Sequence, residues 1–342
     1  NLVAKYHLSN PISITVEGAN ILTRTLMVFG QGAIRCHPYI LKEIQAIESQ
    51  NVKQFDDAFM SHIGHTIRNT VRYLLLTLSR GWLSGHVGHR LSKYERKLSW
   101  VSAMFACYAD IALVTLGGLL KRKENITGRF ADVLSWMYLA MTVMKRYRTD
   151  NKSQDWIYVQ WCLETAFYNC QVAFVELLEN MGWAYKIPAL ILRISPFGKA
   201  PSDALATKVS QHIQTPSEDR DRLTKLCFMP QDQQDPFYQL EKAFAEVFKT
   251  QPIMRKVKKA VQSKVLVKKP LKDLLQDACT KEVISSAEKV QVLKAEELRN
   301  EAIQVDAFTK KDYIGNSPLK ASHSAVKKEF LTQIKQKTQD LN

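Results

Sequence analysis

The sequence predicts an all-α protein. Glycine and proline are scarce, with 13 Gly and 11 Pro among 342 residues, so long stretches run without a turn residue. Apolar residues recur in these stretches at the three- and four-residue spacing of a buried helix face. The alternating apolar and polar runs that are typical of strands are scarce. With 46% hydrophobic residues, the chain is long enough for two compact units with sizeable cores.

The first 90 residues are expected to contain three helices after a connecting loop. We predict the loop at residues 1–13, because the dipeptide Asn10-Pro11 favours a turn. Pro38 suits the start of the second helix, where its missing N–H costs nothing. Helical periodicity places the three helices at residues 20–35, 38–47 and 55–79, followed by a glycine-containing connector at residues 80–89.

Three histidines in this region raise the question of a metal site. His62 and His65 share one helix face, and such a pair can bind a metal ion. No carboxylate or cysteine stands at ligand spacing in the sequence, so we favour two ordinary helix histidines and expect no metal ligand set. His37 has no partner nearby in sequence, so we favour a structural role for it over that of a catalytic acid.

Residues 99–120 form the most hydrophobic window, and its length would allow it to span a membrane. Asp110 lies at its centre, and an aspartate in the middle of a bilayer is costly. Tyr108 and Thr115 dilute the window further. We therefore favour a helix in the core of a bundle, where Asp110 needs a buried partner that the sequence does not identify.

Two more long helices complete a predicted antiparallel bundle, at residues 127–147 and 155–181. Methionine and aromatic stripes along them predict core packing rather than a cofactor site. Residues 182–201 indicate a short aromatic and aliphatic hairpin with a basic rim, which either caps the bundle or inserts at a membrane interface. The elements expected next are short helices at residues 203–213 and 216–225 and a polar loop at residues 230–236.

The chain is strongly basic. Its formal net charge of +15 favours anionic partners. Residues 254–272 carry eight Lys and Arg and no acidic residue, beside a set of apolar residues that can share one helix face. This pattern predicts either a peripheral membrane anchor or a solvated lysine surface. No aromatic residues interleave with the lysines as a base-stacking surface requires, so we expect no nucleic-acid partner.

A last amphipathic helix is predicted at residues 285–306, and the Lys- and Gln-rich tail beyond it is expected to fray. Six cysteines are scattered along the chain with no CxxC pair. We interpret them as thiols of a reducing compartment.

One stretch carries a candidate for chemistry, residues 15–39, TVEGANILTRTLMVFGQGAIRCHPY. Glu17 follows an apolar run and precedes Gly18, which allows two interpretations. Burial would raise the pKa of its carboxyl group towards that of a general base, and Gly18 would let a ligand approach the backbone closely. Alternatively, Glu17 is an ordinary first-turn residue that complements the dipole of a helix beginning near Asn20.

The same stretch resembles the catalytic-glutamate motif of the acyl-CoA dehydrogenases. VEGANILTR and FGQGAIRCHPY are similar to the bacterial long-chain, FadE-type members, and SPFGKAPSDALATKVSQHI and LKAEELRNEAIQVDAF support the resemblance. The resemblance implies FAD as cofactor and oxidation of a long-chain fatty acyl-CoA to trans-2-enoyl-CoA in fatty acid β-oxidation. Glu17 would take the α-proton while the β-hydrogen leaves as hydride to flavin N5. Gly18, Ala19 and Arg24 would lie next to substrate or cofactor, with Ala19 in place of the family's common Thr. For Arg24 a structural role is the alternative.

The resemblance also implies a domain organisation. Residues 1–50 would end the dehydrogenase's C-terminal helical domain and carry the catalytic Glu, residues 51–200 would form an additional helical bundle, and residues 201–342 would form a basic helical C-terminal region. The chain begins 16 residues before Glu17 and contains no glycine-rich phosphate loop. We therefore expect a C-terminal fragment that is inactive in isolation.

The expected setting is the bacterial cytoplasm, with peripheral association with the inner membrane as a further expectation. The resemblance implies an electron-transferring flavoprotein as electron acceptor and a homo-oligomer as the assembly. The competing hypothesis is a non-enzymatic basic helical module for membrane or protein association, since the basic helices do not by themselves require catalysis.

Overall fold

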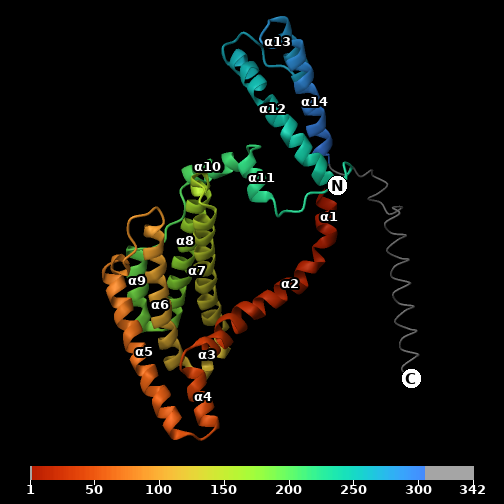
Figure 1. Cartoon of the computed structure of the whole chain (residues 1–342). Helices are drawn as coiled ribbons and strands as arrows, with labels where there is room; N and C mark the ends of the chain where they lie inside the picture. The colour runs from red at the N-terminus through yellow and green to blue at the C-terminus, as the bar shows by residue number, and fades with distance from the viewer. Residues whose placement is uncertain (1, 305–342) are drawn as a thin grey trace, which may run out of the picture. The chain divides into compact units, whose positions relative to one another are not determined.

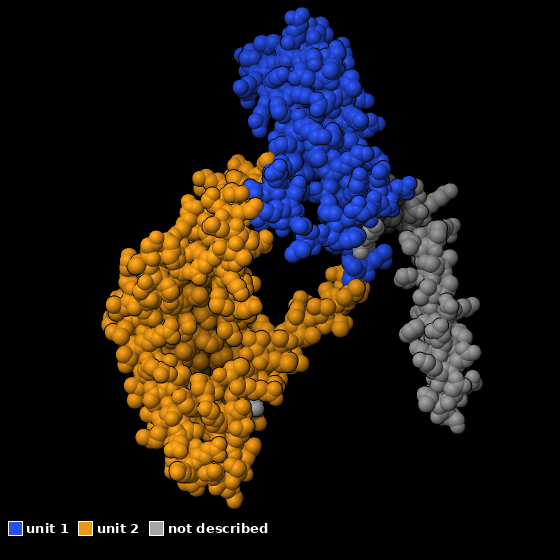
Figure 2. Space-filling view, viewed as in Figure 1, with its two compact units in different colours: residues 1–9, 216–342 blue, residues 10–215 orange. Residues whose placement is uncertain are grey.

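The computed structural model describes residues 2–304, and every regular element among them is a helix. The all-α prediction is therefore confirmed. The chain divides into two compact units, one of residues 10–215 and one of residues 1–9 with residues 216–342 (Figure 1, Figure 2). The finer domain boundaries expected at residues 50 and 200 stay predictions. The predicted fraying tail lies outside the described residues.

The loop expected over residues 1–13 is wrong, because this stretch is helical. Helix α1 spans Leu2–Ser9 and helix α2 spans Pro11–Leu22. Pro11 occupies the first turn of α2, where a missing N–H breaks no helical hydrogen bond, and Asn10 before it has helical dihedral angles. The Asn-Pro pair thus starts a helix and does not form the predicted turn. The sequence then continues through a π-helix, η1 (Thr23–Gln31), and two short helices, α3 (Gly32–Cys36) and α4 (Ile40–Glu48).

Four long helices build the predicted bundle in the unit of residues 10–215. They are α5 (Val52–Leu78), α6 (Ser92–Leu116), α7 (Glu124–Asp150) and α8 (Trp156–Met181). Each packs against the next along the chain, and short 3₁₀ turns lie in the connectors. The core is aromatic and aliphatic, with Phe130, Leu163 and Phe174 entirely buried. Of the predicted methionine and aromatic stripes, Met137, Met144 and Phe167 are buried in this core as well, whereas Met141 is 49% exposed.

Helix α6 contains the most hydrophobic window of the sequence. With η3 it is long and apolar enough to cross a membrane by composition alone. In the structure it packs against α5, α7 and α8, and Val101, Met104 and Ala112 on it are at most 1% exposed. This placement supports the bundle-core interpretation, because the apolar side chains already have protein neighbours.

Lys97, near the start of α6, is buried more than a lysine usually is. Its ammonium group lies 5.7 Å from the centre of the Phe167 ring. Burial is the largest cause that lowers the pKa of Lys97 from 10.5 to about 8; the neighbouring Lys93 acts in the same direction, and Glu164 partly opposes both. The charged form is therefore less stable in the folded chain than in the unfolded chain.

Replacing Lys97 with Met is expected to increase the free energy of unfolding by about 1–2 kcal/mol at pH 7, a figure reduced from the full pKa difference because the side chain is partly solvated. The gain is complete below pH 8, where the wild-type lysine is charged in both states. It disappears as the pH rises from 8 towards 10.5, because the folded state then releases its proton first. Denaturant unfolding at pH 7 and pH 10.5 measures this, and an equal gain at both pH values would assign it to packing.

Residues 182–201 form a helix and not the predicted hairpin. A 3₁₀ turn, η5 (Trp183–Tyr185), leads into α9 (Lys186–Ile194), in which Pro188 sits in the first turn and interrupts nothing. Helix α9 caps the bundle through Ala189 and Leu192 and packs against α8. Its other face remains exposed, with Trp183, Ile187, Leu190, Ile191 and Ile194 all at least 53% accessible. The capping interpretation is thus supported, and the membrane interpretation of the outer face stays a prediction.

The helices predicted at residues 203–213, 216–225 and 285–306 are found, while the start of α12 at Pro236 and the separate helix α13 were not predicted. Helix α10 (Asp203–Ile213) packs against α8. In the unit that contains residues 216–304, α12 packs against α14 around a small core that includes Val257, Leu275 and Val292. Helix α14 begins with a capping box, in which Ser285 and Glu288 satisfy each other's backbone N–H groups. The bounds in this unit are α11 (Glu218–Thr224), α12 (Pro236–Gln262), α13 (Leu271–Thr280) and α14 (Ser286–Ala302).

The basic stretch at residues 254–272 is not one helix, contrary to the sequence interpretation. Helix α12 ends at Gln262, and Lys264 takes a left-handed conformation with φ of 61°. Pro270 then precedes the start of α13. The apolar residues Ile253, Val257 and Ala260 face the small core, so the apolar side expected to face a membrane is already covered in this part of the stretch.

Candidate functional site

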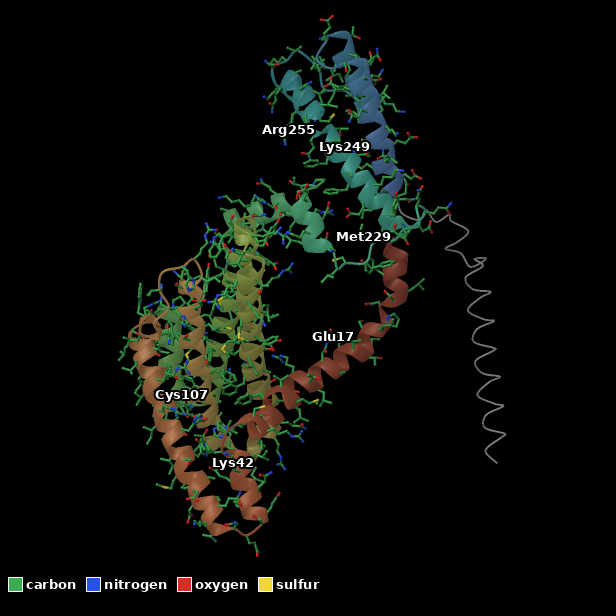
Figure 3. All side chains as sticks on the ribbon, viewed as in Figure 1. Glu17, Lys42, Cys107, Met229, Lys249 and Arg255 are labelled. Atoms are coloured by element: carbon green, nitrogen blue, oxygen red, sulfur yellow. The ribbon has the colours of Figure 1, made fainter. Side chains whose placement is uncertain are left out.

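The predicted catalytic residue, Glu17, lies in the middle of helix α2 (Figure 3). Glu17, Gly18 and Ala19 are all exposed, and α2 has no buried residue. The interpretation of Glu17 as a first-turn residue is wrong, because α2 begins six residues earlier at Pro11. The burial expected for a general base is not supplied by the described residues. Nothing lies within 4 Å of a Cβ placed on Gly18, so a ligand can approach the backbone there.

Arg24, the other predicted site residue, anchors the motif segment to the bundle. Its Nε lies 2.6 Å from Asp132 Oδ1 and its NH2 lies 2.5 Å from Asp132 Oδ2, which makes a bidentate pair with α7. The hydrogen bonds that Arg24 donates to the Asp132 carboxylate raise the pKa of its guanidinium. Gly128 makes room for this guanidinium, since a Cβ there would lie 2.9 Å from Arg24 NH1. Arg24 therefore has a structural partner, and its predicted position near a cofactor stays a prediction.

Two further contacts hold the same segment. The hydroxyl of Thr127 donates a hydrogen bond to the backbone oxygen of Thr25. The ring of Phe29 stacks on that of Phe130 with centroids 4.1 Å apart, and both rings are buried. These contacts pack η1 on α7. Helix α2, which precedes η1 and carries Glu17, extends away from the bundle (Figure 1).

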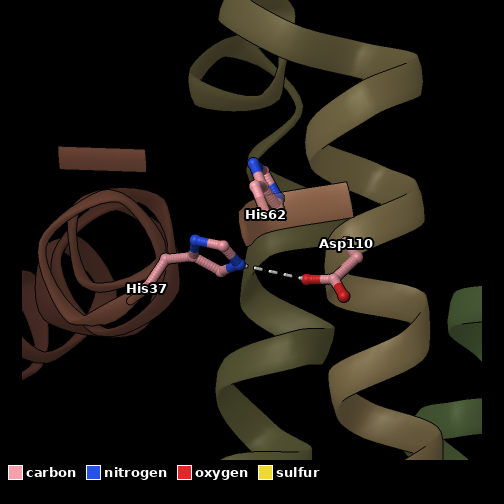
Figure 4. Close-up of side chains that lie close together, drawn as sticks. All are labelled: His37, His62 and Asp110. Atoms are coloured by element: carbon pink, nitrogen blue, oxygen red, sulfur yellow. Dashed lines mark ion pairs between the residues drawn. The ribbon is translucent and has the colours of Figure 1, made fainter. Parts of the chain in front are cut away.

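A second group of functional side chains lies where α3, α5 and α6 approach one another. His37 from the α3–α4 connection, His62 from α5 and Asp110 from α6 point towards each other (Figure 4). His37 Nε2 lies 3.4 Å from Asp110 Oδ1, and the side chains are 9% and 4% exposed. Asn69 donates a hydrogen bond of 3.2 Å to the other oxygen, Asp110 Oδ2. The structure thus supplies the buried partners that Asp110 required.

The structural role favoured for His37 is also found. Its Nδ1 accepts hydrogen bonds from the backbone N–H groups of Tyr39 and Ile40, at 3.3 and 3.2 Å, at the start of α4. Burial alone would raise the pKa of Asp110, but the neighbouring His37 and Asn69 side chains outweigh it and leave that pKa below its ordinary value. The aspartate is therefore a carboxylate at neutral pH.

Sequence reasoning missed this group because it searched for ligands at helical spacing. Asp110 stands 48 residues after His62 and 73 after His37. Only the packing of α6 against α5 brings these residues together. One signal was available: an aspartate at the centre of an apolar window requires a polar partner from another helix, and the region's histidines were candidates. Likewise, no spacing rule connects Arg24 with Asp132.

The described residues thus form a helical bundle, and η1, which follows the Glu17-Gly18 helix α2, is held on this bundle by the pair of Arg24 and Asp132. Over residues 34–308 the chain matches the family described as acyl-CoA dehydrogenase, C-terminal, bacterial type. The chain belongs to that family, which confirms the resemblance to the C-terminal portion of the FadE-type proteins. The matched range begins after Glu17, so it does not include the glutamate motif. No solved structure matches the chain.

Proposed function

We propose that this chain is the C-terminal part of an FAD-dependent acyl-CoA dehydrogenase that oxidises long-chain fatty acyl-CoA to trans-2-enoyl-CoA. The observation that carries the proposal is the family match over residues 34–308, together with the VEGANILTR motif at residues 16–24, upstream of the matched range. The family description itself names a C-terminal domain, which supports a longer protein.

The base in this proposal is the Glu17 carboxylate, which accepts the α-proton of the thioester. The flavin supplies the chemistry of a hydride acceptor when bound. The described residues supply only the proposed base of such a site. Gly18 lets a ligand approach the backbone beside Glu17, but Glu17 itself is exposed. The residues that hold the flavin phosphates and the acyl-CoA are therefore assigned to the part of the longer protein outside this chain.

The surface of α2 supports this assignment. Its large apolar side chains are 49–76% exposed: Ile12, Ile14, Val16, Ile21 and Leu22. Exposure of so many large apolar groups on one short helix is unfavourable in water, so we infer that another part of the longer protein covers them. The same cover would desolvate Glu17 and raise the pKa of its carboxyl group towards that of a working base.

The test is acyl-CoA-dependent reduction of a dye acceptor by the longer protein, with palmitoyl-CoA as substrate. The proposal expects bound flavin and turnover, with an electron-transferring flavoprotein replacing the dye as acceptor and a homo-oligomer in solution. A purified longer protein with neither flavin nor turnover would favour the alternative, a non-enzymatic basic helical module for membrane or protein association.

We further propose that the protein is cytoplasmic and associates peripherally with the inner membrane through its basic C-terminal region. Within the basic stretch, Lys256 pairs with Glu288 at 2.8 Å and Lys269 pairs with Asp277 at 2.6 Å. These two lysines are partly neutralised by the protein. The charges proposed to meet anionic lipid are Lys258, Lys259, Lys264 and Lys268, all of which are exposed.

Changing those four lysines to Gln is expected to weaken sedimentation of the chain with phosphatidylserine-containing vesicles by about 10-fold or more, because each cation near an anionic surface contributes about 1 kcal/mol. The matched control removes four exposed lysines elsewhere, Lys53, Lys123, Lys145 and Lys208, which equalises the change in net charge. Equal weakening in both variants would indicate only a general effect of net charge and would remove the basic stretch as the anchor.

A further inference from the structure

The side chains of His37, His62 and Asp110 form a group that the proposed dehydrogenase chemistry does not use. One ligand-type atom from each lies within 4.8 Å of the corresponding atoms of the other two. Three histidine rings gather here, with the His37 ring 4.5 Å from that of His62 and 5.4 Å from that of His65. We propose that His37, His62 and Asp110 bind a divalent metal ion of the zinc type.

The distances suit such an ion. Ligands about 2.0–2.1 Å from a tetrahedral zinc ion lie about 3.3–3.4 Å from one another. The separation of 3.4 Å between His37 Nε2 and Asp110 Oδ1 is already that of two zinc ligands. The ligand-type atom of His62 lies within 4.8 Å of the other two, so it completes the set by moving closer by up to about 1.4 Å. Two imidazoles and one carboxylate are a common zinc ligand set with one position left for water.

The surrounding hydrogen bonds orient the ligands as they do around bound metals. Glu43 Oε1 lies 2.8 Å from His62 Nδ1, and this carboxylate directs the ring so that Nε2 remains available. Asn69 donates to Asp110 Oδ2 and so leaves Oδ1 for the ion. These are the outer contacts that ligating histidines and carboxylates usually have.

His37 gives the strongest indication of a metal site, and metal binding to it also has the largest cost in lost hydrogen bonds. Its Nε2 is buried, yet it has no aligned hydrogen-bond partner in the described part of the chain. Binding through Nε2 moves the ring proton to Nδ1, which breaks the two hydrogen bonds from Tyr39 and Ile40. Those bonds are long, at 3.3 and 3.2 Å, and a metal–imidazole bond outweighs them. Because this proton only moves from Nε2 to Nδ1 of the same ring, neutral His37 releases no proton to solvent when the ion binds.

An ion can reach the group from outside. A cavity of about 300 Å³ is lined on one wall by His37, His65 and Asp110, and by Phe29, Phe105 and Leu134 elsewhere. Cys36 also lines it, and this residue is exposed, so the cavity opens at the protein surface. The cavity therefore leaves room for water next to His37 and Asp110, two of the three proposed ligands.

The test titrates the complete 342-residue chain with Co²⁺ after dialysis against EDTA, followed through the visible absorption of tetrahedral Co²⁺ and then displacement by Zn²⁺. We expect one ion per chain. His62→Gln and Asp110→Asn should each weaken binding at least about 100-fold, and Glu43→Gln, which only orients His62, should weaken it about 10–100-fold. The control His212→Gln changes an exposed histidine of α10 and should bind as the wild type does.

Absence of binding at about 1 mM metal, or unchanged affinity in His62→Gln, would overturn the proposal. Circular dichroism establishes first that each variant folds. Where a variant fails to fold, X-ray absorption of the zinc-loaded wild-type chain decides, because it needs no substitution. Two imidazole nitrogens at about 2.0 Å support the site, while a sulfur shell at about 2.3 Å or a shell without imidazole contradicts it.

Discussion

Replacing Glu17 with Gln in the longer protein is expected to reduce palmitoyl-CoA-dependent turnover by about 10³-fold or more, if Glu17 is the base proposed above. The amide has nearly the same shape as the carboxylate but cannot accept the α-proton. Loss of a positioned general base typically costs about 10²–10⁴-fold, and the weak acidity of a thioester α-proton places the effect towards the upper end. Dye reduction measures the rate, and the flavin absorbance per protein should stay unchanged.

The matched control is Glu48→Gln, the same chemical change at an exposed residue at the end of α4. It should leave turnover and flavin content at wild-type levels. If Glu17→Gln retains turnover, Glu17 is not the base. If it loses flavin together with turnover, the residue supports cofactor binding and its catalytic role would need a separate test.

The long helices of the bundle were the most predictable part of the fold. The patterns at residues 55–79 and 155–181 correspond to α5 and α8 within three residues at each end. Continuous helical periodicity over seven turns has few alternative explanations, because one face must be buried. Short stretches with proline were less predictable. Asn10-Pro11, Pro188 and Pro270 are each compatible with a helix start or a turn, and only the neighbouring packing decides.

The two candidate sites also differ in how far the sequence could predict them. Glu17 was identified from a local motif, but its environment depends on residues that the motif does not contain. The group around Asp110 depends on three segments that are distant in sequence, so no spacing rule predicts it. The sequence did indicate that a buried Asp110 would be unfavourable without a polar partner. In the structure, His37 and Asn69 are these partners.

The close approach of the segment after α9 to helix α8 leads to the largest expected loss of stability. Gln171 of α8 donates a hydrogen bond of 2.7 Å to the oxygen of Leu192 and accepts one of 3.1 Å from the N–H of Phe197. Phe197 is 2% exposed and lies among Trp100 and Phe174. Gly198 follows at once, and a Cβ there would lie 2.0 Å from the backbone oxygen of Phe167.

Gly198→Ala is therefore expected to reduce the free energy of unfolding by about 3 kcal/mol or more. Backbone atoms of a core helix cannot move aside as a flexible side chain can, so the segment itself must withdraw. That movement weakens both Gln171 hydrogen bonds, at about 1 kcal/mol each, and uncovers part of Phe197, whose full burial is worth about 1.5–3 kcal/mol. Thermal unfolding followed by circular dichroism should show a fall of about 6–12 °C.

Gly64→Ala is the matched control, because the same methyl group is added to an exposed position of α5 with nothing within 4 Å. It is expected to change stability in the opposite direction, with a gain of about 0.5–1 kcal/mol, since alanine favours a helix over glycine. Opposite signs for the two variants would assign the loss at Gly198 to steric contact with α8. A Gly198→Ala chain that unfolds at the wild-type temperature would show that this segment is not packed on α8 as described.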